Sequence, residues 1–487
     1  MKKRHILFRA DGNRNIGLGH ISRCLALAEL LHDDFEIYFA ICEPEAYVLD
    51  EVKKITLQII SLPKPASIDD FNGELSSYLT GREIVVLDGY SFTTEYESIV
   101  KKSAASVIAI DDIPNRHFVA DGVINFCGTI DASEYSKEFY TQLYIGFDYL
   151  FLRKPFLRMQ SKKSPSDMLL LNMGGADSGN ETQRILHEVL ESGFSGRILV
   201  IIGQSYPYKA SLEPIVRSHS FITVKQGLTA LEMFNAMNQC AMAILTPSTV
   251  ALEFLSTGGV LFVNQTAKNQ QCIKEYLLRQ KLAFDYSEFM EFVTVNRNNA
   301  NKVASGKSDG LIDGSSLQRV KDLFISISIS ANLKFRKAVE KDVALVFKWA
   351  NDPEVRKYSY SNSEILWQEH VQWFARKISD PLCEYFIVEM DKGPIAQIRF
   401  DFSREEHGAY VISYQIDKNW RGKGLGYPVL VKGMQKLIEV RTVEKIIGYV
   451  QNSNIPSIKA FRSAGFREIV SLKYSNSSKF ELSFLKV

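Results

Sequence analysis

The chain has 487 residues, of which 46% are hydrophobic and 23% charged, and a formal net charge of +2. At about 100–200 residues per domain, this length predicts about three structural units. The balanced charge argues against a nucleic-acid-binding protein, and no stretch of about 18 uninterrupted apolar residues predicts a membrane span.

Short apolar strands alternate with amphipathic helices in the first third of the chain. Residues 5–9 predict a strand and residues 21–31 a helix, and further strands are expected at 35–40, 84–87 and 107–110. This alternation is typical of a parallel sheet covered by helices.

A second series of the same kind follows a polar linker at residues 161–166. Its strands are expected at 168–173, 198–203, 242–245 and 260–263. Two parallel-sheet halves joined by a linker predict a ligand cleft at the carboxyl ends of their strands.

The pattern changes again after the polar stretch 296–316. The last 150 residues, roughly one domain, mix helices with antiparallel-looking strands at 385–390, 395–401 and 410–416. We therefore predict an α/β protein with domains at 1–155, 156–325 and 334–487, and a linker at 326–333.

Six cysteines are scattered along the chain with no C-x-x-C pair, which argues against a structural zinc site and a disulfide framework. We expect all six to be reduced thiols in a cytoplasmic enzyme.

A glycine-rich turn joins the first strand to the first helix. Gly17 and Gly19 permit close approach to a ligand, and His20 falls at the helix N-terminus. Exposed N–H groups there favour an anion and disfavour imidazolium, so His20 is a candidate general base. A simple turn with an incidental histidine is the alternative.

Three more candidate clusters follow strands in the second half of this region. Gly174 and Gly175 form a loop that could hold a phosphate, Ser248 and Glu253 open a helix where a carboxylate could accept ribose hydroxyls, and residues 268–271 supply amides. An ordinary strand-to-helix turn is the alternative for the loop with Gly174 and Gly175.

Residues 4 to about 325 resemble the UDP-sugar hydrolase family of pseudaminic acid biosynthesis, which is similar in fold to the GT-B glycosyltransferases. The matching pieces are residues 16–20 with Arg23, 88–90, 111–112, 146–149 with 152–153, 173–177, Ser248 with Glu253, and 269–270. The resemblance implies a GT-B-like pair of Rossmann-type domains, the catalytic residues His20, Tyr90 and Asn269, and UDP-sugar contacts from Gly17, Gly19, Arg23, Gly174, Gly175, Ser248, Glu253 and Gln270.

The same resemblance implies a metal-independent reaction. His20 would activate a water that attacks the anomeric carbon while UDP leaves, with inversion of configuration.

The last domain carries the motif R-x-x-G-x-G at residues 421–426, between a strand and a helix. Consecutive backbone N–H groups at a helix start can bind a pyrophosphate. A second cue is the segment 450–466, where Asn454 opens a helix that Gly465 closes.

Residues 333–487 resemble the GNAT acetyltransferases, which implies a mixed-sheet domain that uses acetyl-CoA as co-substrate. The implied acetyl-CoA contacts are Ile416, Arg421, Gly422, Lys423, Gly424, Leu425, Gly426 and Asn454. Many members place a tyrosine four residues before the Gly-Phe pair as general acid, and Phe461 stands there in this chain. Tyr414, Ser457 or water could take that role. His370 lines the acceptor side together with Trp373 and Phe374, or Trp373 and Phe374 belong to the core.

The two resemblances together predict a bifunctional enzyme that acetylates a UDP-4-amino sugar and then hydrolyses UDP-2,4-diacetamido-2,4,6-trideoxy-β-L-altropyranose. Its expected partners are the UDP-sugar, acetyl-CoA and water, with no metal, nucleic acid or membrane span. The alternatives are a GT-B glycosyltransferase or a UDP-sugar binding module, joined to an acetyltransferase for proteins or other amines.

Overall fold

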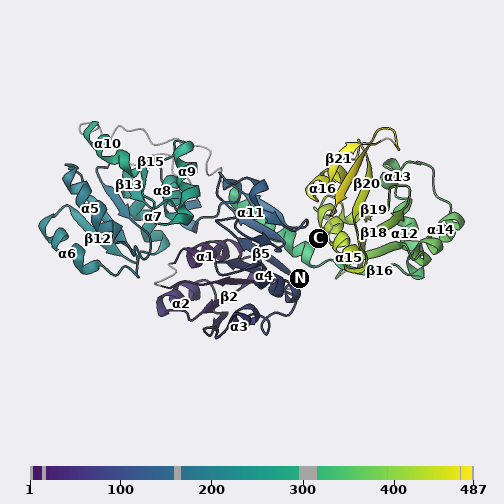
Figure 1. Cartoon of the computed structure of the whole chain (residues 1–487), viewed down its shortest axis with the longest axis horizontal. Helices are drawn as coiled ribbons and strands as arrows, with labels where there is room; N and C mark the ends of the chain where they lie inside the picture. The colour runs from purple at the N-terminus through teal and green to yellow at the C-terminus, as the bar shows by residue number, and fades with distance from the viewer. Residues whose placement is uncertain are drawn as a thin grey trace. The chain divides into compact units, whose positions relative to one another are not determined.

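The computed structural model describes residues 4–13, 18–157, 166–295, 315–391, 393–471 and 473–484. The chain divides into two compact units, Met1–Phe324 and Ile325–Val487, called the first and second unit below. The first unit holds two large parallel sheets, and the second holds one mixed sheet (Figure 1).

The first sheet has the strand order β3-β2-β1-β4-β5-β7-β9, and its neighbouring strands pair in parallel. Its central strands are almost wholly buried, which explains their continuous apolar sequences. The strands are β1 (Arg4–Ala10), β2 (Phe35–Cys42), β3 (Ile59–Leu62), β4 (Ile84–Asp88), β5 (Ser106–Ile110), β7 (Gly122–Asn125) and β9 (Gln142–Ile145), with the helices α1 (Gly19–Leu31), α2 (Ala46–Lys53), α3 (Ile68–Gly73) and α4 (Thr94–Ser103) and a small pair β6 (His117–Phe118) and β8 (Ser136–Lys137).

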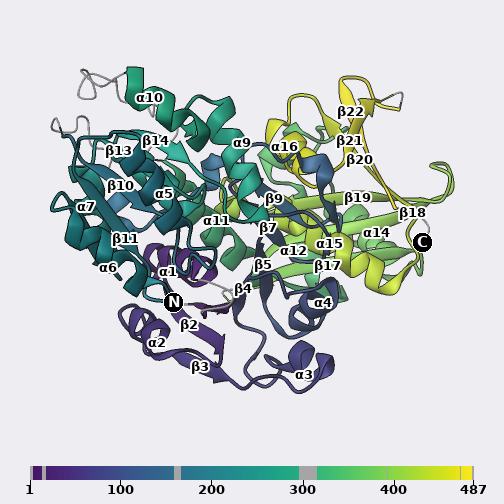
Figure 2. The ribbon, with the colours of Figure 1, turned by 60° about the vertical axis from the view of Figure 1, so that its left-hand side comes forward.

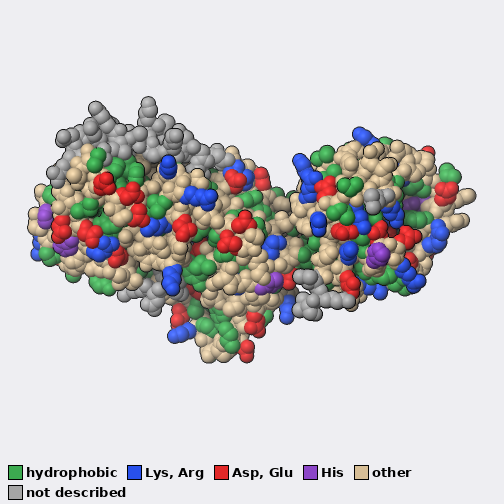
Figure 3. Space-filling model, turned by 45° about the horizontal axis from the view of Figure 1, so that its top comes forward, with side chains coloured by type: hydrophobic (Ala, Val, Ile, Leu, Met, Phe, Trp, Pro, Cys, Tyr) green, Lys and Arg blue, Asp and Glu red, His purple; other side chains and the backbone are tan. Residues whose placement is uncertain are grey.

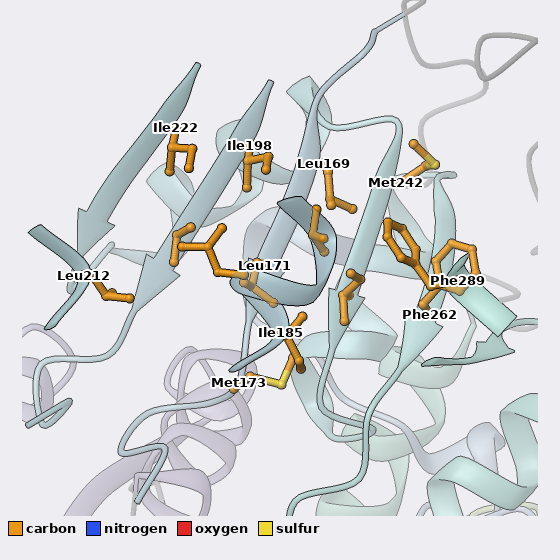
Figure 4. Packing of buried hydrophobic residues seen from close by; sticks show 14 of the residues in the cluster. Leu169, Leu171, Met173, Ile185, Ile198, Leu212, Ile222, Met242, Phe262 and Phe289 are labelled. Carbon is orange, nitrogen blue, oxygen red and sulfur yellow. The ribbon is translucent and has the colours of Figure 1, made fainter. Parts of the chain in front are cut away.

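The second sheet repeats this plan in the order β12-β11-β10-β13-β14-β15. Leu171 and Ile198 of its strands pack with Ile185 of α5 in one buried cluster that extends to Phe262 and Phe289 (Figure 4). Its elements are β10 (Leu169–Asn172), α5 (Glu181–Glu191), β11 (Ile198–Ile202), α6 (Lys209–Ser218), β12 (Ile222–Gln226), α7 (Ala230–Gln239), β13 (Met242–Leu245), α8 (Thr249–Ser256), β14 (Val260–Val263), α9 (Gln271–Arg279), β15 (Phe284–Asp285) and α10 (Phe289–Val295).

Each parallel sheet reverses its strand order at its first strand in the sequence. β1 lies between β2 and β4, and β10 lies between β11 and β13. In open α/β sheets, ligands bind outside the carboxyl ends of the strands at such a reversal. The loops that follow β1, β4, β10 and β13 are therefore the expected binding segments.

The sheet of the second unit has the order β16-β17-β18-β19-β20-β22-β21. Figure 2 shows its strands β17 to β22. Only its β19–β20 pair is parallel, and that pairing covers just Tyr410–Ile412 against Ile446–Gly448. The elements are β16 (Lys334–Lys337), α12 (Val343–Ala350), α13 (Pro353–Lys357), α14 (Trp367–Ser379), β17 (Cys383–Met390), β18 (Gly393–Ser403), β19 (Ala409–Ile416), α15 (Gly426–Val440), β20 (Lys445–Gln451), α16 (Ile455–Ser463), β21 (Arg467–Val470) and β22 (Ser477–Ser483).

The predicted fold class, two parallel-sheet halves followed by a mixed-sheet domain, is confirmed. The division after Phe324 lies inside α11 (Ser316–Ala331), so helix occupies most of the stretch predicted as the linker 326–333. Across the described ranges, no helix is both long and apolar enough to cross a membrane. Basic and acidic side chains are interspersed on the face shown in Figure 3.

Candidate functional sites

The centre of the first site is a buried histidine–aspartate pair. His20 is the second residue of α1, and Asp88 ends the neighbouring strand β4. The Nδ1 atom of His20 lies 2.7 Å from Oδ1 of Asp88, and both side chains are buried. The strand reversal between β1 and β4 brings together two residues that are 68 positions apart in the sequence.

Arg23 lies one turn after His20 on α1 and binds two carboxylates. Its Nε and Nη2 atoms donate to both oxygens of Asp88, at 2.8 and 2.5 Å, and its Nη1 donates to Asp112 at 2.5 Å. Burial by itself would raise the pKa of the Asp88 carboxyl, but the charge of Arg23 and the hydrogen bonds from His20 and Arg23 outweigh it, and the pKa is lowered. Asp88 is therefore ionised at neutral pH.

Tyr90 extends this network toward the second half of the unit. Its hydroxyl donates to Oδ2 of Asp112 at 2.8 Å and accepts from Nδ2 of Asn269 at 2.7 Å. Its ring meets the imidazole of His20 edge-on, with centroids 4.8 Å apart. Burial, and then the charge of Asp112, raise the pKa of Tyr90, so the hydroxyl stays protonated. The structure thus brings His20, Tyr90 and Asn269 into one site.

The predicted glycine positions occupy the loops around this site. Gly174 has a φ of +91°, which favours glycine, and follows β10. A Cβ atom on Gly175 would lie 3.8 Å from Cβ of Leu18, the residue before Gly19 and α1. Gly17 lies outside the described residues.

The other predicted UDP-sugar contacts differ in how far their side chains are already engaged. Ser248 is the N-cap of α8 and makes no side-chain capping bond within the helix. Glu253 is buried and accepts hydrogen bonds from Arg153 at 2.6 and 2.5 Å. Gln270 accepts from the backbone N–H of Thr266 at 2.8 Å. Binding of ribose by Glu253 would require it to share its bonds with Arg153.

Sequence reasoning did not assign roles to Asp88 and Asp112. The signal was present, because each carboxylate comes at or just after the end of a buried strand of the first sheet. Asp111, next to Asp112, takes another direction and accepts from Tyr135 at 2.9 Å.

The expectation of six reduced thiols is wrong for two cysteines. Cys127, after β7, and Cys272, on α9, form a disulfide with Cα atoms 6.1 Å apart. They are 145 residues apart in the sequence, so their spacing carried no sign of the pairing. The cysteines outside this disulfide are Cys24, Cys42, Cys240 and Cys383. Among the described residues, no group of three or more His, Cys, Asp or Glu could hold a metal ion.

The second site is built around the glycine loop between β19 and α15. Gly422 and Gly424 have φ values of +74° and +73°, Leu425 is buried, and Gly426 is the first residue of α15. Lys423 lies over the ring of Trp420, 4.7 Å from its centroid.

Arg421 holds the start of this loop. Its side chain donates to the carbonyl of Ile416 at 2.9 Å and to Asp352 and Glu354 at 2.8 and 3.0 Å. These contacts engage the guanidinium of Arg421. The loop can therefore offer a ligand its backbone N–H groups rather than this side chain. Asn454 caps α16 by accepting from the N–H of Ser457 at 3.3 Å.

A pair of hydroxyls lies where β19 and β20 separate. The hydroxyl of Tyr414 is 3.1 Å from Oγ of Ser457 and 3.6 Å from the position of a Cβ on Gly426. Burial raises the pKa of Tyr414, although the bond with Ser457 acts in the opposite direction. Phe461 is buried against Gly448, so it contributes packing at this point.

Two aromatic residues of α14, Trp373 and Phe374, pack in the interior of the second unit. Phe374 lies in a buried cluster with Trp349, and Trp373 packs against that cluster. His370 is also buried, which lowers its pKa.

Comparisons with known proteins separate the same two units. A family model described as an acetyltransferase (GNAT) domain matches residues 332–467. A UDP-2,4-diacetamido-2,4,6-trideoxy-β-L-altropyranose hydrolase of Campylobacter jejuni is 23% identical over 286 residues, which cover 58% of this chain and 98% of that protein. An uncharacterized protein of Methanocaldococcus jannaschii is 23% identical over 483 residues, 94% of this chain and 96% of that protein.

One solved structure is similar to part of this chain. A spermidine N-acetyltransferase from Vibrio cholerae, in complex with CoA and spermine, is 15% identical and covers 31% of this chain and 96% of its own. The TM-score is 0.29.

Proposed function

We propose that this chain, which joins a homologue of the UDP-2,4-diacetamido-2,4,6-trideoxy-β-L-altropyranose hydrolases to a GNAT acetyltransferase domain, is a bifunctional enzyme of UDP-amino-sugar metabolism. The second unit acetylates the 4-amino group of a UDP-sugar, and the first unit hydrolyses the diacetamido product to free sugar and UDP. The observation that carries the proposal is the convergence of His20, Tyr90 and Asn269 at the strand reversal of the first sheet.

The hydrolysis follows from the arrangement around His20. Because Asp88 engages Nδ1, the Nε2 atom of the neutral imidazole can take a proton from water. The resulting hydroxide attacks the anomeric carbon, the bond from that carbon to the phosphate oxygen breaks, and UDP leaves with the electron pair. Attack from the face opposite UDP inverts the configuration.

The departing diphosphate needs positive potential. The loop with Gly174 and Gly175, which precedes α5, and the start of α8 after Ser248 both lie at the carboxyl ends of parallel strands. Backbone N–H groups at such positions stabilise developing phosphate charge. Tyr90 and Asn269 are placed to orient the sugar beside His20.

The acetyl transfer uses the second unit. The N–H groups of residues 422–426 would bind the pyrophosphate of acetyl-CoA, and the separated ends of β19 and β20 would admit its pantetheine arm. The amine of the sugar attacks the thioester carbonyl and the C–S bond breaks. The thiolate of CoA takes up one proton, and the nitrogen, which becomes an amide, releases one proton to solvent. With Phe461 in the usual tyrosine position, Tyr414 is the hydroxyl we assign as the proton donor, with Ser457 as its hydrogen-bond partner.

A coupled assay on the whole chain tests the proposal. The substrate is UDP-4-amino-4,6-dideoxy-N-acetyl-altrosamine, given with and without acetyl-CoA, and mass spectrometry follows CoA, UDP and free sugar. We expect UDP release that depends on acetyl-CoA and is insensitive to a chelator. His20→Ala should abolish UDP release and leave CoA release unchanged.

His32→Ala is the matched control, because His32 is exposed at the other end of α1. It should leave both products unchanged. CoA release without UDP would contradict the hydrolase assignment and favour a transferase that needs another acceptor. Absence of both products would contradict the proposed substrate.

A further inference from the structure

A chain of hydrogen bonds connects His20 to the second half of the first unit. It runs from His20 to Asp88, then to Arg23, Asp112, Tyr90 and finally Asn269. We propose that Asp88 is a positioning residue that fixes the tautomer and orientation of His20, and that the Arg23–Asp112–Tyr90 link makes this positioning depend on Asn269. This inference rests on the proposed hydrolase function.

The first step concerns the tautomer. A carboxylate only accepts hydrogen bonds, so the 2.7 Å contact with Asp88 requires a proton on Nδ1 of His20. The lone pair of the neutral ring is then on Nε2, the atom that has to accept the proton of water. Nη2 of Arg23, which can only donate, lies 3.4 Å from the same Nδ1, so without Asp88 the other tautomer and other ring orientations become accessible.

The second step concerns the aspartate itself. Asp88 has no solvent exposure, and an isolated buried carboxylate would tend to pick up a proton. Arg23 prevents this by donating to both of its oxygens, and a forked guanidinium fixes the plane of the carboxylate as well as its charge. Arg23 therefore holds Asp88 in the form and direction that His20 needs.

The third step concerns the link to Asn269. The remaining Arg23 nitrogen, Nη1, binds Asp112, whose other oxygen accepts from Tyr90. Asn269 is the middle residue of a short 3₁₀ helix (η4, Lys268–Gln270) of the second half, 179 residues from Tyr90, and donates to the same hydroxyl. Asn269 and Asp112 hold the same hydroxyl, so removing Asn269 removes one of the two bonds that fix Tyr90 beside Asp112 and thereby weakens the constraint on Arg23.

The test compares Asp88→Asn with Asp111→Asn, a neighbouring carboxylate that binds Tyr135 and takes no part in the chain. We expect Asp88→Asn to lower kcat for UDP release by on the order of 10²–10⁴-fold with an unchanged KM, and Asp111→Asn to change kcat by less than about threefold. Acetyl transfer in the second unit should be unchanged in both variants and serves as a check on folding.

A readout independent of activity is the ¹⁵N spectrum of His20, assigned through its loss in His20→Ala. We expect the Nδ1–H tautomer in the wild type and a mixture in Asp88→Asn. An Nε2–H tautomer in the wild type would overturn the inference even if UDP is released. An Nδ1–H tautomer without UDP release would contradict the hydrolase assignment and leave the positioning intact.

Asp112→Asn provides a second variant in case Asp88→Asn does not fold, because Asp112 is less deeply buried. We expect Asp112→Asn and Asn269→Ala each to lower kcat, and the double variant to lose less than the product of the two single losses, since both break one chain. Independent, multiplying losses would contradict the coupling of Asn269 to His20.

Discussion

The two sites of this chain are built from different parts of the polypeptide. In the first unit, the site is formed by side chains, because His20, Arg23 and two aspartates make a hydrogen-bonded ionic network. In the second unit we propose that the backbone forms the site, because Gly422 and Gly424 shape a loop whose N–H groups would bind the ligand. Arg421 holds the start of this loop through its bonds to Asp352 and Glu354.

This difference determines how each site is expected to fail. Removing one member of a network of buried charges strongly lowers the unfolding free energy, because the remaining charges stay buried without an opposite charge. A backbone loop keeps its N–H groups whatever its side chains are. A substitution there costs only the strain of holding the backbone in the required conformation. The first site is therefore expected to be sensitive to charge, and the second to backbone strain.

The largest expected effect is that of Arg23→Met, which leaves Asp88 and Asp112 without their cation. We expect the first unit to lose about 3–5 kcal/mol of unfolding free energy at pH 7. The pKa of Asp88 is lowered in the folded protein, so its pairing contributes stability that is complete above the unfolded value of about 3.9 and is lost as the pH falls through the folded value. The difference between wild type and variant should therefore narrow toward acidic pH.

Two optical signals measure this loss separately in each unit. All four tryptophans of the chain, Trp349, Trp367, Trp373 and Trp420, lie in the second unit, so their fluorescence follows that unit alone during urea unfolding. Circular dichroism follows both units. Arg184→Met is the control, because its pair with Glu181 on α5 is exposed and is worth less than about 1 kcal/mol. Equal losses in the two variants would refute the ionic account of the first site.

The sequence predicts the sheets of both units and the residues that resemble known families, but it does not predict which side chains meet. Asp88 ends a predicted strand, yet its contact with His20 depends on β4 lying beside β1. Cys127 and Cys272 meet for a similar reason, since each belongs to a different half of the first unit. Such contacts depend on strand order and on packing between halves, and no local pattern encodes them.

Helix α11 shows a different kind of limit. The run of alternating isoleucine and serine at residues 325–330 was not read as helix. The buried residues Val320, Leu323, Phe324 and Ile327 have helical spacing and decide the structure. This helical spacing begins before residue 326, so it lies mostly outside the predicted linker 326–333.

Tyr414→Phe is the next prediction in size and asks whether the second site also depends on a side chain. Loss of the hydroxyl should lower kcat of acetyl transfer by about 10²-fold, the lower end of the range for general acids, with little change in the KM for acetyl-CoA. Ser457→Ala should have a smaller effect in the same direction, since it removes only the partner of that hydroxyl.

Tyr410→Phe is the matched control, because Tyr410 lies on the same strand but is buried before β19 and β20 separate. It should leave kcat unchanged. If Tyr414→Phe also leaves kcat unchanged, the thiolate is protonated by water, and the second site depends on its backbone alone.

Gly424→Ala is the smallest expected effect and tests the role of the backbone directly. There is open space around Gly424, so an added methyl group meets no neighbour, but its φ of +73° costs an alanine about 1–2 kcal/mol. We expect the KM for acetyl-CoA to rise by about tenfold, because the loop must adopt this strained conformation to present its N–H groups.

Gly408→Ala carries the same strain, at φ +82°, in the turn between β18 and β19, away from the loop. Both variants should lose similar stability, and only Gly424→Ala should weaken acetyl-CoA binding, as measured by calorimetry. If both weaken binding equally, the glycine loop holds no pyrophosphate, and the contrast between a site of side chains and a site of backbone fails.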